Sequence, residues 1–201
     1  MDELQFFRNA WNTCIELIKD RNFIIDDTYN QISDADFRYL LSEKNIDIYA
    51  ENAEKNRSIY IKFLLTTKIK PTLIKNIVDE IKEQSQYPNF DLIIVLKSKP
   101  NNTITKIEKE KTGVNLQIMW CKQLQINITK HFLVPNHTKC SDEEVSDILK
   151  KYSLINKLQL PIVLRDDPVI RYYNFKSGDI IRITGTKLSM NNNYIFYRCV
   201  K

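Results

Sequence analysis

The feature that most constrains the fold is the uninterrupted apolar run Leu92–Leu96, which has polar residues beyond both ends. A strand with one face in water alternates apolar and polar residues, so this run predicts a strand that is covered on both faces. Further strands are predicted at residues 46–50, 58–65 and 114–120. Because helical segments separate these strands, the first part of the chain is expected to form a mixed α/β sheet.

Three segments of this first part have apolar residues at helical spacing. Leu4, Phe7, Trp11 and Ile18 predict an amphipathic helix over residues 2–21, with Trp11 in the core. Ser33 is expected to cap a second, short helix whose inward residues are Phe37, Leu40 and Leu41. A third helix is expected to begin at Pro71, with its apolar face formed by Leu73, Ile74, Ile77, Val78 and Ile81.

The last third of the chain predicts two helices and a β-hairpin. Ser141–Glu144 has the pattern of a capping box and is expected to start a helix that ends near Tyr152. Asp167 can accept free backbone N–H groups at the start of a second helix, and Pro168 suits the first helical position. A turn at Lys176–Asp179 then leads into a strand at 180–183, and a second strand is expected at 194–200.

The chain of 201 residues is therefore interpreted as two modules, which together are α+β or mixed α/β. The first comprises residues 1–128, with helices packed on a mixed sheet. The second comprises residues 129–201, with helices and a small antiparallel sheet. The formal net charge of +5 lies in the second module, because residues 1–128 contain equal numbers of acidic and basic side chains.

The composition excludes several classes of protein. The four cysteines are far apart and form no C-x-x-C pair, which favours buried free thiols over a zinc site or a disulfide framework. The N-terminus is acidic and no long apolar run follows it, so neither a signal peptide nor a membrane span is expected. With three glycines and abundant Asn, Ile and Lys, the sequence is typical of an AT-rich genome.

Two arrangements of polar residues bear on catalysis. Asp47 followed by Tyr60-Ile61-Lys62 is similar to the D…(D/E)-x-K pattern of a nuclease fold, but Tyr60 stands where metal-assisted cleavage needs a second carboxylate. Lys62 is therefore interpreted as a solvent-facing residue of a strand. His131 and His137 lack further metal ligands at suitable spacing, which favours packing or hydrogen bonding. We expect no catalysis, no cofactor and no metal.

A resemblance rests on motifs that run through some seventy residues. The pattern NIT-x-H-x-LVP-x-H occupies Asn127–His137, and it is followed by a helix, Leu160-Pro161, the motif DPV-x-RY at Asp167–Tyr172, a K-x-G turn and a final Tyr197-Arg198. These motifs closely resemble the assembly module of the fifth-subunit family of multisubunit RNA polymerases. Its members are shared by eukaryotic RNA polymerases I, II and III, and the archaeal counterpart corresponds to this module alone. Arg8, Trp11 and Asp20–Phe23 also resemble the front domain of the eukaryotic members.

The resemblance implies a non-catalytic structural subunit that docks on the largest polymerase subunit and extends a jaw beside downstream double-stranded DNA. An obligate homo-oligomer is not expected. The location would be the nucleus for a cellular protein, or the virion or cytoplasmic viral factory for a viral one, and secretion is not expected. The partner-binding residues that it assigns are His131, Pro135, His137, Pro161, Asp167, Pro168, Arg171, Tyr172, Lys176, Gly178, Arg182, Tyr197 and Arg198.

Four residues are expected in a loop near downstream DNA: Lys97, Lys99, Asn101 and Asn102. Their contacts would be to phosphates, which position a duplex without reading its sequence. An ordinary solvated loop is the alternative reading. For the arginines of the second module, the alternatives are an interface with an acidic partner or a charge that only keeps the module soluble. The alternative for the whole chain is a stand-alone nucleic-acid-binding or degenerate nuclease-like protein.

The sequence also departs from the family pattern. Asparagine replaces the usual glycine at Asn22, at Asn174 and at 191–193, and asparagine tolerates the left-handed backbone region best after glycine. Gly185 stands where family members usually carry an arginine, so one polar contact is expected to be missing. The segment 187–193 replaces the family's hairpin tip, and no role is assigned to it.

Overall fold

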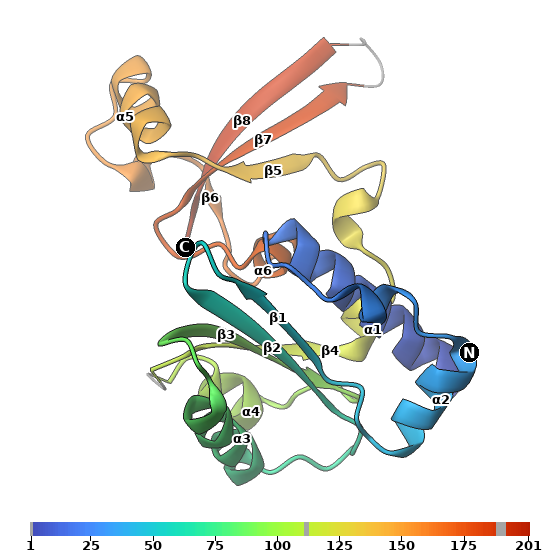
Figure 1. Cartoon of the computed structure of the whole chain (residues 1–201). Coiled ribbons are helices and arrows are strands. Elements are labelled where there is room, and N and C mark those ends of the chain that lie inside the picture. Colours follow the sequence, from blue (N-terminus) through green and yellow to red (C-terminus); the bar gives the residue numbers. More distant parts are fainter. Residues whose placement is uncertain (1, 111–112, 188–191) are drawn as a thin grey trace. The chain divides into compact units, whose positions relative to one another are not determined.

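The computed structural model describes residues 2–110, 113–187 and 192–201. The chain forms two compact units, Met1–Ile126 and Asn127–Lys201 (Figure 1). Both units combine helices with a sheet, which confirms the predicted fold class. The sequence-based division at residue 128 lies two residues beyond the division between these units.

Unit 1 is built around a four-stranded sheet. Its elements are α1 (Glu3–Asp20), η1 (Asp27–Asn30), α2 (Asp34–Ser42), β1 (Ile48–Asn52), β2 (Arg57–Leu64), α3 (Pro71–Gln84), β3 (Asn89–Leu96), α4 (Asn102–Ile107), β4 (Asn115–Trp120) and η2 (Cys121–Leu124). The strand order is β1-β2-β3-β4. The first pair is antiparallel and the other two are parallel, because α3 and α4 carry the chain back between successive strands.

The prediction that the strand at Leu92–Leu96 is covered on both faces is confirmed. Every residue from Phe90 to Leu96 is buried. Leu92, Ile94 and Leu96 pack with apolar residues of α3 and α4. Successive side chains of a strand alternate between faces, so Ile93 and Val95 point to the opposite face, on the side of α1 (Figure 1).

The helices of unit 1 differ in detail from their predictions. Trp11 is buried as predicted, and its indole Nε1 donates to the Ile46 carbonyl oxygen at 3.2 Å. The predicted apolar face of α3 is wrong at Leu73, which lies in the first turn and is exposed. Phe37 is the buried residue of α2, whereas Leu40 and Leu41 are only partly covered. The sequence did not predict α4, because its apolar residues Ile104 and Ile107 span a single turn.

The described residues of unit 2 form two α-helices, two short 3-10 helices (η) and a second sheet. Its elements are η3 (Ile128–Lys130), β5 (Asn136–Lys139), α5 (Asp142–Lys151), η4 (Lys157–Gln159), β6 (Ile162–Val163), α6 (Pro168–Tyr173), β7 (Ile180–Lys187) and β8 (Asn192–Val200). The strand order is β5-β7-β8-β6. The prediction of an antiparallel sheet is wrong for one pair, because β6 runs parallel to β8. A strand of two residues has too little pattern to be predicted.

The capping and turn predictions in unit 2 are confirmed. Ser141 and Glu144 form the reciprocal capping box at the start of α5. Asn174 ends α6 with φ of 57°, in the left-handed region, and Gly178 has φ of 87° in the turn before β7. In unit 1, Asn22 also has a positive φ, of 63°. Asn191 lies outside the described residues, and Asn192 and Asn193 belong to β8.

Gly185 has a structural role in the hairpin. It pairs with Tyr194 across β7 and β8, and the Tyr194 ring occupies the space that a Cβ atom at position 185 would need. An aromatic ring that covers a strand glycine in this way restores the packing that glycine lacks.

Candidate partner and nucleic-acid interfaces

Three of the predicted partner-binding residues shape the backbone of unit 2. The Asp167 Oδ1 atom accepts the backbone N–H groups of Val169 at 2.9 Å and Ile170 at 3.3 Å, and Pro168 is the first residue of α6. Gly178 supplies the positive φ of the turn into β7. These residues therefore determine where α6 and the hairpin lie within the unit.

Three others are engaged inside unit 2. Tyr172 is buried, and its hydroxyl oxygen accepts from Asn127 Nδ2 at 2.8 Å. The Lys176 amine donates to Asn174 Oδ1 at 2.7 Å. Arg182 Nη1 donates to Glu144 Oε1 at 2.6 Å, which joins β7 to the start of α5.

The histidines make local contacts with the loop between η3 and β5. His131 is exposed and stacks on Phe132, and its Nδ1 atom accepts from the Leu133 backbone N–H at 3.3 Å. The Nδ1 atom of His137 lies 2.7 Å from the Pro135 carbonyl oxygen, so this ring nitrogen carries the proton and donates. Hydrogen bonding is thus the role that the geometry gives to both imidazole rings.

The remaining predicted residues lie at or near the surface of unit 2. Arg171 Nη1 is 3.8 Å from Asp166 Oδ1, and the Arg198 guanidinium donates to the Ile162 carbonyl oxygen at 3.0 Å. The Pro161 carbonyl oxygen accepts the backbone N–H of Cys199 at 2.9 Å, which extends the pairing of β6 with β8. The ring of Tyr197 meets that of Tyr152 edge to face.

Unit 2 also exposes large apolar side chains that are not among the predicted partner-binding residues. Ile155 is 92% exposed, Phe132 81% and Leu164 65%. The further members of this set are Leu133, Tyr152, Leu158, Ile162, Ile195 and Phe196. Isolated exposed apolar residues are common, whereas apolar side chains that gather in one exposed patch are typical of a surface that binds a partner. A signal was present in the sequence, because Phe132-Leu133 and Leu154-Ile155 are apolar pairs outside any predicted helix or strand.

The four residues predicted near nucleic acid have different environments in unit 1. Lys97 forms an ion pair with Glu3 and lies 5.7 Å from the centre of the Phe7 ring. Asn101 caps α4, because its Oδ1 atom accepts from the Ile104 backbone N–H at 2.9 Å, and Asn102 is the first residue of that helix. The prediction that these residues form one loop is therefore wrong for Asn102. Lys99 is exposed.

Lys99 lines a surface pocket of about 350 Å³ together with Lys68 and Lys70. The pocket lies where β2 and β3 end, because Thr67 to Lys70 follow β2 and Ser98 to Asn101 follow β3. Ligands of parallel sheets commonly bind at this edge. The lining contains three lysines and no acidic residue, so the pocket favours an anion. Sequence reasoning missed Lys68 and Lys70, which are distant from Lys99 along the chain.

The nuclease-like positions do not form a metal site. Lys62 Nζ lies 2.9 Å from Asp47 Oδ2, and Asp47 Oδ1 accepts the Phe63 backbone N–H at 2.9 Å. Lys62 lies on the less buried face of β2, where burial alternates along the strand, and its ammonium group is ion-paired there. Tyr60 packs against Tyr49 and Phe90. Within residues 2–110, 113–187 and 192–201, there is no group of three or more potential metal ligands.

The cysteines and the helices bear on two further expectations. Cys14, Cys121, Cys140 and Cys199 are buried free thiols, as predicted. Burial raises the pKa of each of these thiols. Among the described helices, none has the length and apolar character needed to cross a membrane.

Comparison with known proteins assigns the chain to a family. Residues 126–200 match the model of "RNA polymerase Rpb5, C-terminal domain", which corresponds to nearly all of unit 2. A putative DNA-directed RNA polymerase subunit of invertebrate iridescent virus 6 is 30% identical, over 81% of this chain and 90% of its own length. This chain belongs to the RNA polymerase Rpb5 family.

Other relatives in the Rpb5 family extend the match through unit 1. The subunit rpabc1 of DNA-directed RNA polymerases I, II and III from Dictyostelium discoideum is 28% identical over the whole of both chains. Subunit 5A of DNA-directed RNA polymerase V from Arabidopsis thaliana is 28% identical, over 92% of this chain and 84% of its own. The resemblance seen in the motifs is thereby confirmed.

Proposed function

We propose that this member of the Rpb5 family is a non-catalytic subunit of a multisubunit DNA-directed RNA polymerase. Unit 2 docks on the largest subunit, and unit 1 is a jaw that lies beside downstream DNA. The observation that carries the proposal is the set of exposed apolar side chains in unit 2, within the residues that match the family model. A nuclear location follows for a cellular polymerase, and a virion or viral factory for a viral one.

The chemistry of unit 2 supports a permanent protein interface. Burial of a side chain as large as Ile155 or Leu164 contributes about 1.5–3 kcal/mol, and permanent interfaces are more apolar than transient ones. Arg198 is exposed on the same unit and offers its guanidinium group to carboxylates of the partner. Asp167, Tyr172 and Arg182 each make separate hydrogen bonds within unit 2, which hold the local backbone in place.

The experiment that tests this proposal is purification of the tagged chain from its native source, with mass spectrometry of stoichiometric partners. Recovery of the two large catalytic subunits is the expected result and also identifies the polymerase. Recovery of the chain alone, together with tight or metal-dependent action on DNA by the isolated protein, would instead establish the stand-alone alternative.

The lysine pocket supports the DNA-facing role of unit 1. Lys68, Lys70 and Lys99 can take phosphate oxygens, whereas Lys97 is already paired with Glu3. Three lysines on a unit of neutral net charge give weak binding alone, because non-specific affinity grows with the number of phosphates neutralised. The contact therefore matters only when the polymerase holds the duplex in place.

A charge-reversal experiment tests this contact. Replacement of Lys68, Lys70 and Lys99 by glutamate is expected to leave assembly unchanged and to lower the salt concentration at which the elongation complex releases DNA. The salt dependence of binding falls by about 0.9 in its logarithmic slope for each phosphate that the protein no longer neutralises. Reversal of Lys75 and Lys82 on α3, two lysines outside the pocket, is the control for a general loss of positive charge. Equal effects of the two sets would remove the pocket from the proposal.

A further inference from the structure

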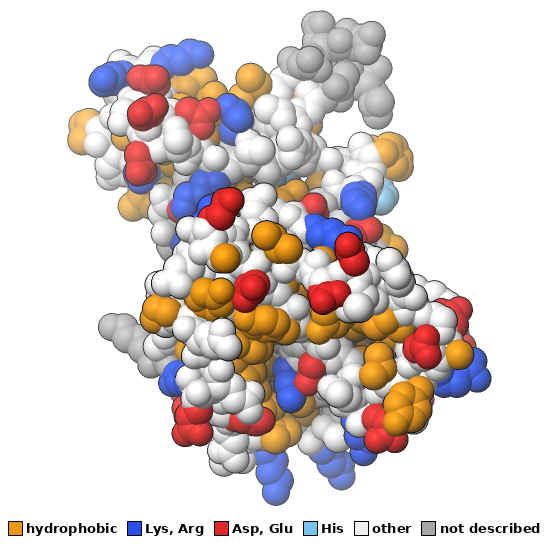
Figure 2. Space-filling view, in the orientation of Figure 1, with side chains coloured by type: hydrophobic (Ala, Val, Ile, Leu, Met, Phe, Trp, Pro, Cys, Tyr) orange, Lys and Arg blue, Asp and Glu red, His pale blue; other side chains and the backbone are white. Residues whose placement is uncertain are grey.

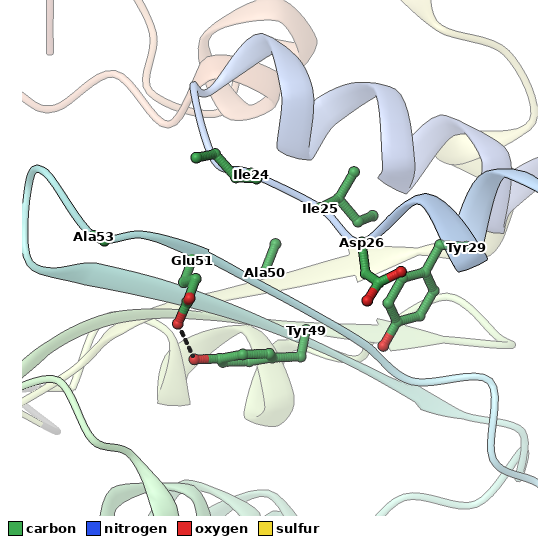
Figure 3. A pocket seen from close by; sticks show the side chains of 8 residues that line it. All are labelled: Ile24, Ile25, Asp26, Tyr29, Tyr49, Ala50, Glu51 and Ala53. Carbon is green, nitrogen blue, oxygen red and sulfur yellow. Dashed lines mark hydrogen bonds between the residues drawn. The ribbon is translucent and has the colours of Figure 1, made fainter.

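A second pocket of unit 1 is lined by residues of the opposite charge. It has a volume of about 400 Å³ and is lined by Ile24, Ile25, Asp26, Tyr29, Tyr49, Ala50, Glu51 and Ala53 (Figure 3). Asp26 and Glu51 are acidic and none of the lining residues is basic. The surface over the region of β1 combines hydrophobic and acidic side chains (Figure 2).

The pocket lies at the free edge of the sheet. β1 is an edge strand, and within the described residues its outer edge forms a main-chain bridge with Ile24. The Ile24 N–H donates to the Glu51 carbonyl oxygen at 2.7 Å, and the Glu51 N–H donates to the Ile24 carbonyl oxygen at 3.2 Å. The chain then turns away, because the Asp26 carbonyl oxygen accepts from the Tyr29 N–H to form η1.

Because the segment after Ile24 turns away from β1, the main-chain N–H and C=O groups of Tyr49 have no strand partner on the outer edge within the described residues. Residues two apart in a strand direct their N–H and C=O groups to the same edge, so Tyr49 faces outward in the same way as Glu51. Apart from the bridge at Ile24, no described residue pairs with the outer edge of β1. An unpaired edge of this kind can accept one more extended segment.

The side chains beside this edge favour a cation. Glu51 Oε2 accepts from the hydroxyl groups of Tyr49 at 3.1 Å and Tyr87 at 3.2 Å, while its Oε1 atom has no hydrogen bond within the described residues. Tyr49 and Glu51 point to one side of β1, and Ala50 points to the other (Figure 3). Asp26 accepts the Thr28 N–H at 2.8 Å, which lowers the pKa of its carboxyl and keeps it ionised.

We propose that this edge binds an extended segment of a partner protein, with an arginine or lysine opposite Tyr49. That residue exchanges main-chain hydrogen bonds with Tyr49. Its side chain lies on the same side of the sheet as the Tyr49 ring and the Glu51 carboxylate, because directly paired residues share a face. The cation then forms an ion pair with the Glu51 carboxylate and a cation–π contact with the Tyr49 ring. The neighbouring residues of the segment face Ala50 and Ile25 and are small and apolar.

This site is independent of the proposed function, since it requires only a folded unit 1. The probe for the test is a short valine- and threonine-rich peptide with one central arginine, added to the full chain. Two matched peptides have glutamate at the centre, or an N-methylated arginine that keeps the charge but lacks the main-chain N–H. Binding is followed by NMR, and the expected shift changes are confined to the surroundings of Ile24, Tyr49 and Glu51.

Two conservative variants make the result specific. Glu51→Gln still accepts from the tyrosines and Asp26→Asn still caps η1, so both are expected to fold. Glu51→Gln is expected to weaken binding of the arginine peptide by about tenfold, since a hydrogen bond to a charged group contributes about 1.5 kcal/mol or more. Asp26→Asn is expected to weaken it less, because Asp26 lies on the other side of β1 and does not contact the cation (Figure 3). The control variant Glu54→Gln removes an equal charge from the turn after β1, outside the pocket, and should leave binding unchanged.

The proposal is overturned by absence of binding, or by equal binding of all three peptides. Equal loss in Glu54→Gln would show a general electrostatic attraction and would overturn it as well. Concentration-dependent self-association that Glu51→Gln abolishes would assign the edge to a second copy of the chain instead of a basic partner segment.

Discussion

At the scale of single residues, Asn174 shows how a chain with three glycines forms a turn that needs a positive φ. It ends α6 in the left-handed region, which excludes most side chains but is tolerated by asparagine. Asn22 has the same role after α1, where its φ is 63°. At both positions, asparagine therefore takes the positive-φ conformation for which glycine is the more common residue.

Replacement of Asn174 is therefore expected to have unequal effects with two small residues. Asn174→Ala should lower the free energy of unfolding by about 1 kcal/mol, because alanine is strained at a φ of 57°. Asn174→Gly should cost less, although it also removes the Asn174–Lys176 hydrogen bond. Urea unfolding of the two variants measures the difference, and a glycine variant less stable than the alanine variant would contradict this account.

The thiol of Cys121 predicts a dependence of stability on pH. Burial raises the pKa of this thiol from 9.0 to about 12. In the unfolded chain the thiol ionises near pH 9, whereas in the folded chain it stays neutral. The stabilisation is therefore fully present below pH 9 and is lost as the pH rises from about 9 to 12. Urea midpoints measured across this range should fall.

Other groups also titrate at high pH, so the comparison needs a variant. Cys121→Ala is expected to be less stable at neutral pH, because it leaves a small cavity. Its stability should fall less steeply above pH 9 than that of the wild type. Parallel decreases in the two proteins would show that Cys121 does not contribute to the pH dependence.

At the scale of elements, the sheet of unit 1 is held at one end by a buried carboxylate. Asp91, at the start of β3, accepts two hydrogen bonds from Arg57 Nη2 on β2, at 3.0 and 3.1 Å, and one from Asn115 Nδ2 on β4, at 2.7 Å. The Asp91 side chain is 5% exposed and that of Arg57 is 43% exposed. The hydrogen bonds of Asp91 thus connect β2, β3 and β4 and stabilise the register of the two parallel pairs.

Asp91→Ala is expected to destabilise the protein by about 2 kcal/mol, since it leaves polar partners without their charged acceptor. The half-exposed guanidinium of Arg57 can turn to water, which keeps the cost below that of breaking a fully buried ion pair. Asp79→Ala on the exposed side of α3 removes a similar carboxylate and should change stability by less than about 0.5 kcal/mol. Equal unfolding midpoints for the two variants would show that the hydrogen bonds of Asp91 do not stabilise the sheet.

At the scale of the whole molecule, assembly is expected to depend on the exposed apolar side chains of unit 2. The double substitution Ile155→Asp and Leu164→Asp should leave the thermal unfolding temperature nearly unchanged, because both side chains are in water in the isolated chain. It should reduce affinity for the largest polymerase subunit by more than about tenfold, since burial of each side chain corresponds to about 1.5 kcal/mol or more. Quantitative co-purification measures the effect.

The matched control lies in unit 1, where Tyr39 is also exposed. Tyr39→Asp places one new negative charge on an exposed apolar position that the proposal does not use, and it should co-purify as the wild type does. Retention of the unit 2 double variant in the complex would place the docking surface elsewhere.

Much of this protein was determined by its local sequence. The capping boxes, the N-cap at Asp167 and the asparagines at positive φ follow from the shape and hydrogen bonding of a few adjacent residues. The motifs from Asn127 to Arg198 likewise indicate the family from residue types and spacing alone. Such features depend on short-range sterics and capping, which act over a few residues along the chain.

Which residues lie together in the candidate sites depends on the tertiary structure. Lys68, Lys70 and Lys99 meet because parallel strands end at one edge of a sheet, and Tyr49 is open because the segment after Ile24 turns away from β1. The partners of Lys97 and Arg182, and the exposure of Ile155, also depend on contacts between residues far apart in the sequence. A linear pattern contains the residue types but not their distances, and binding depends on the distances.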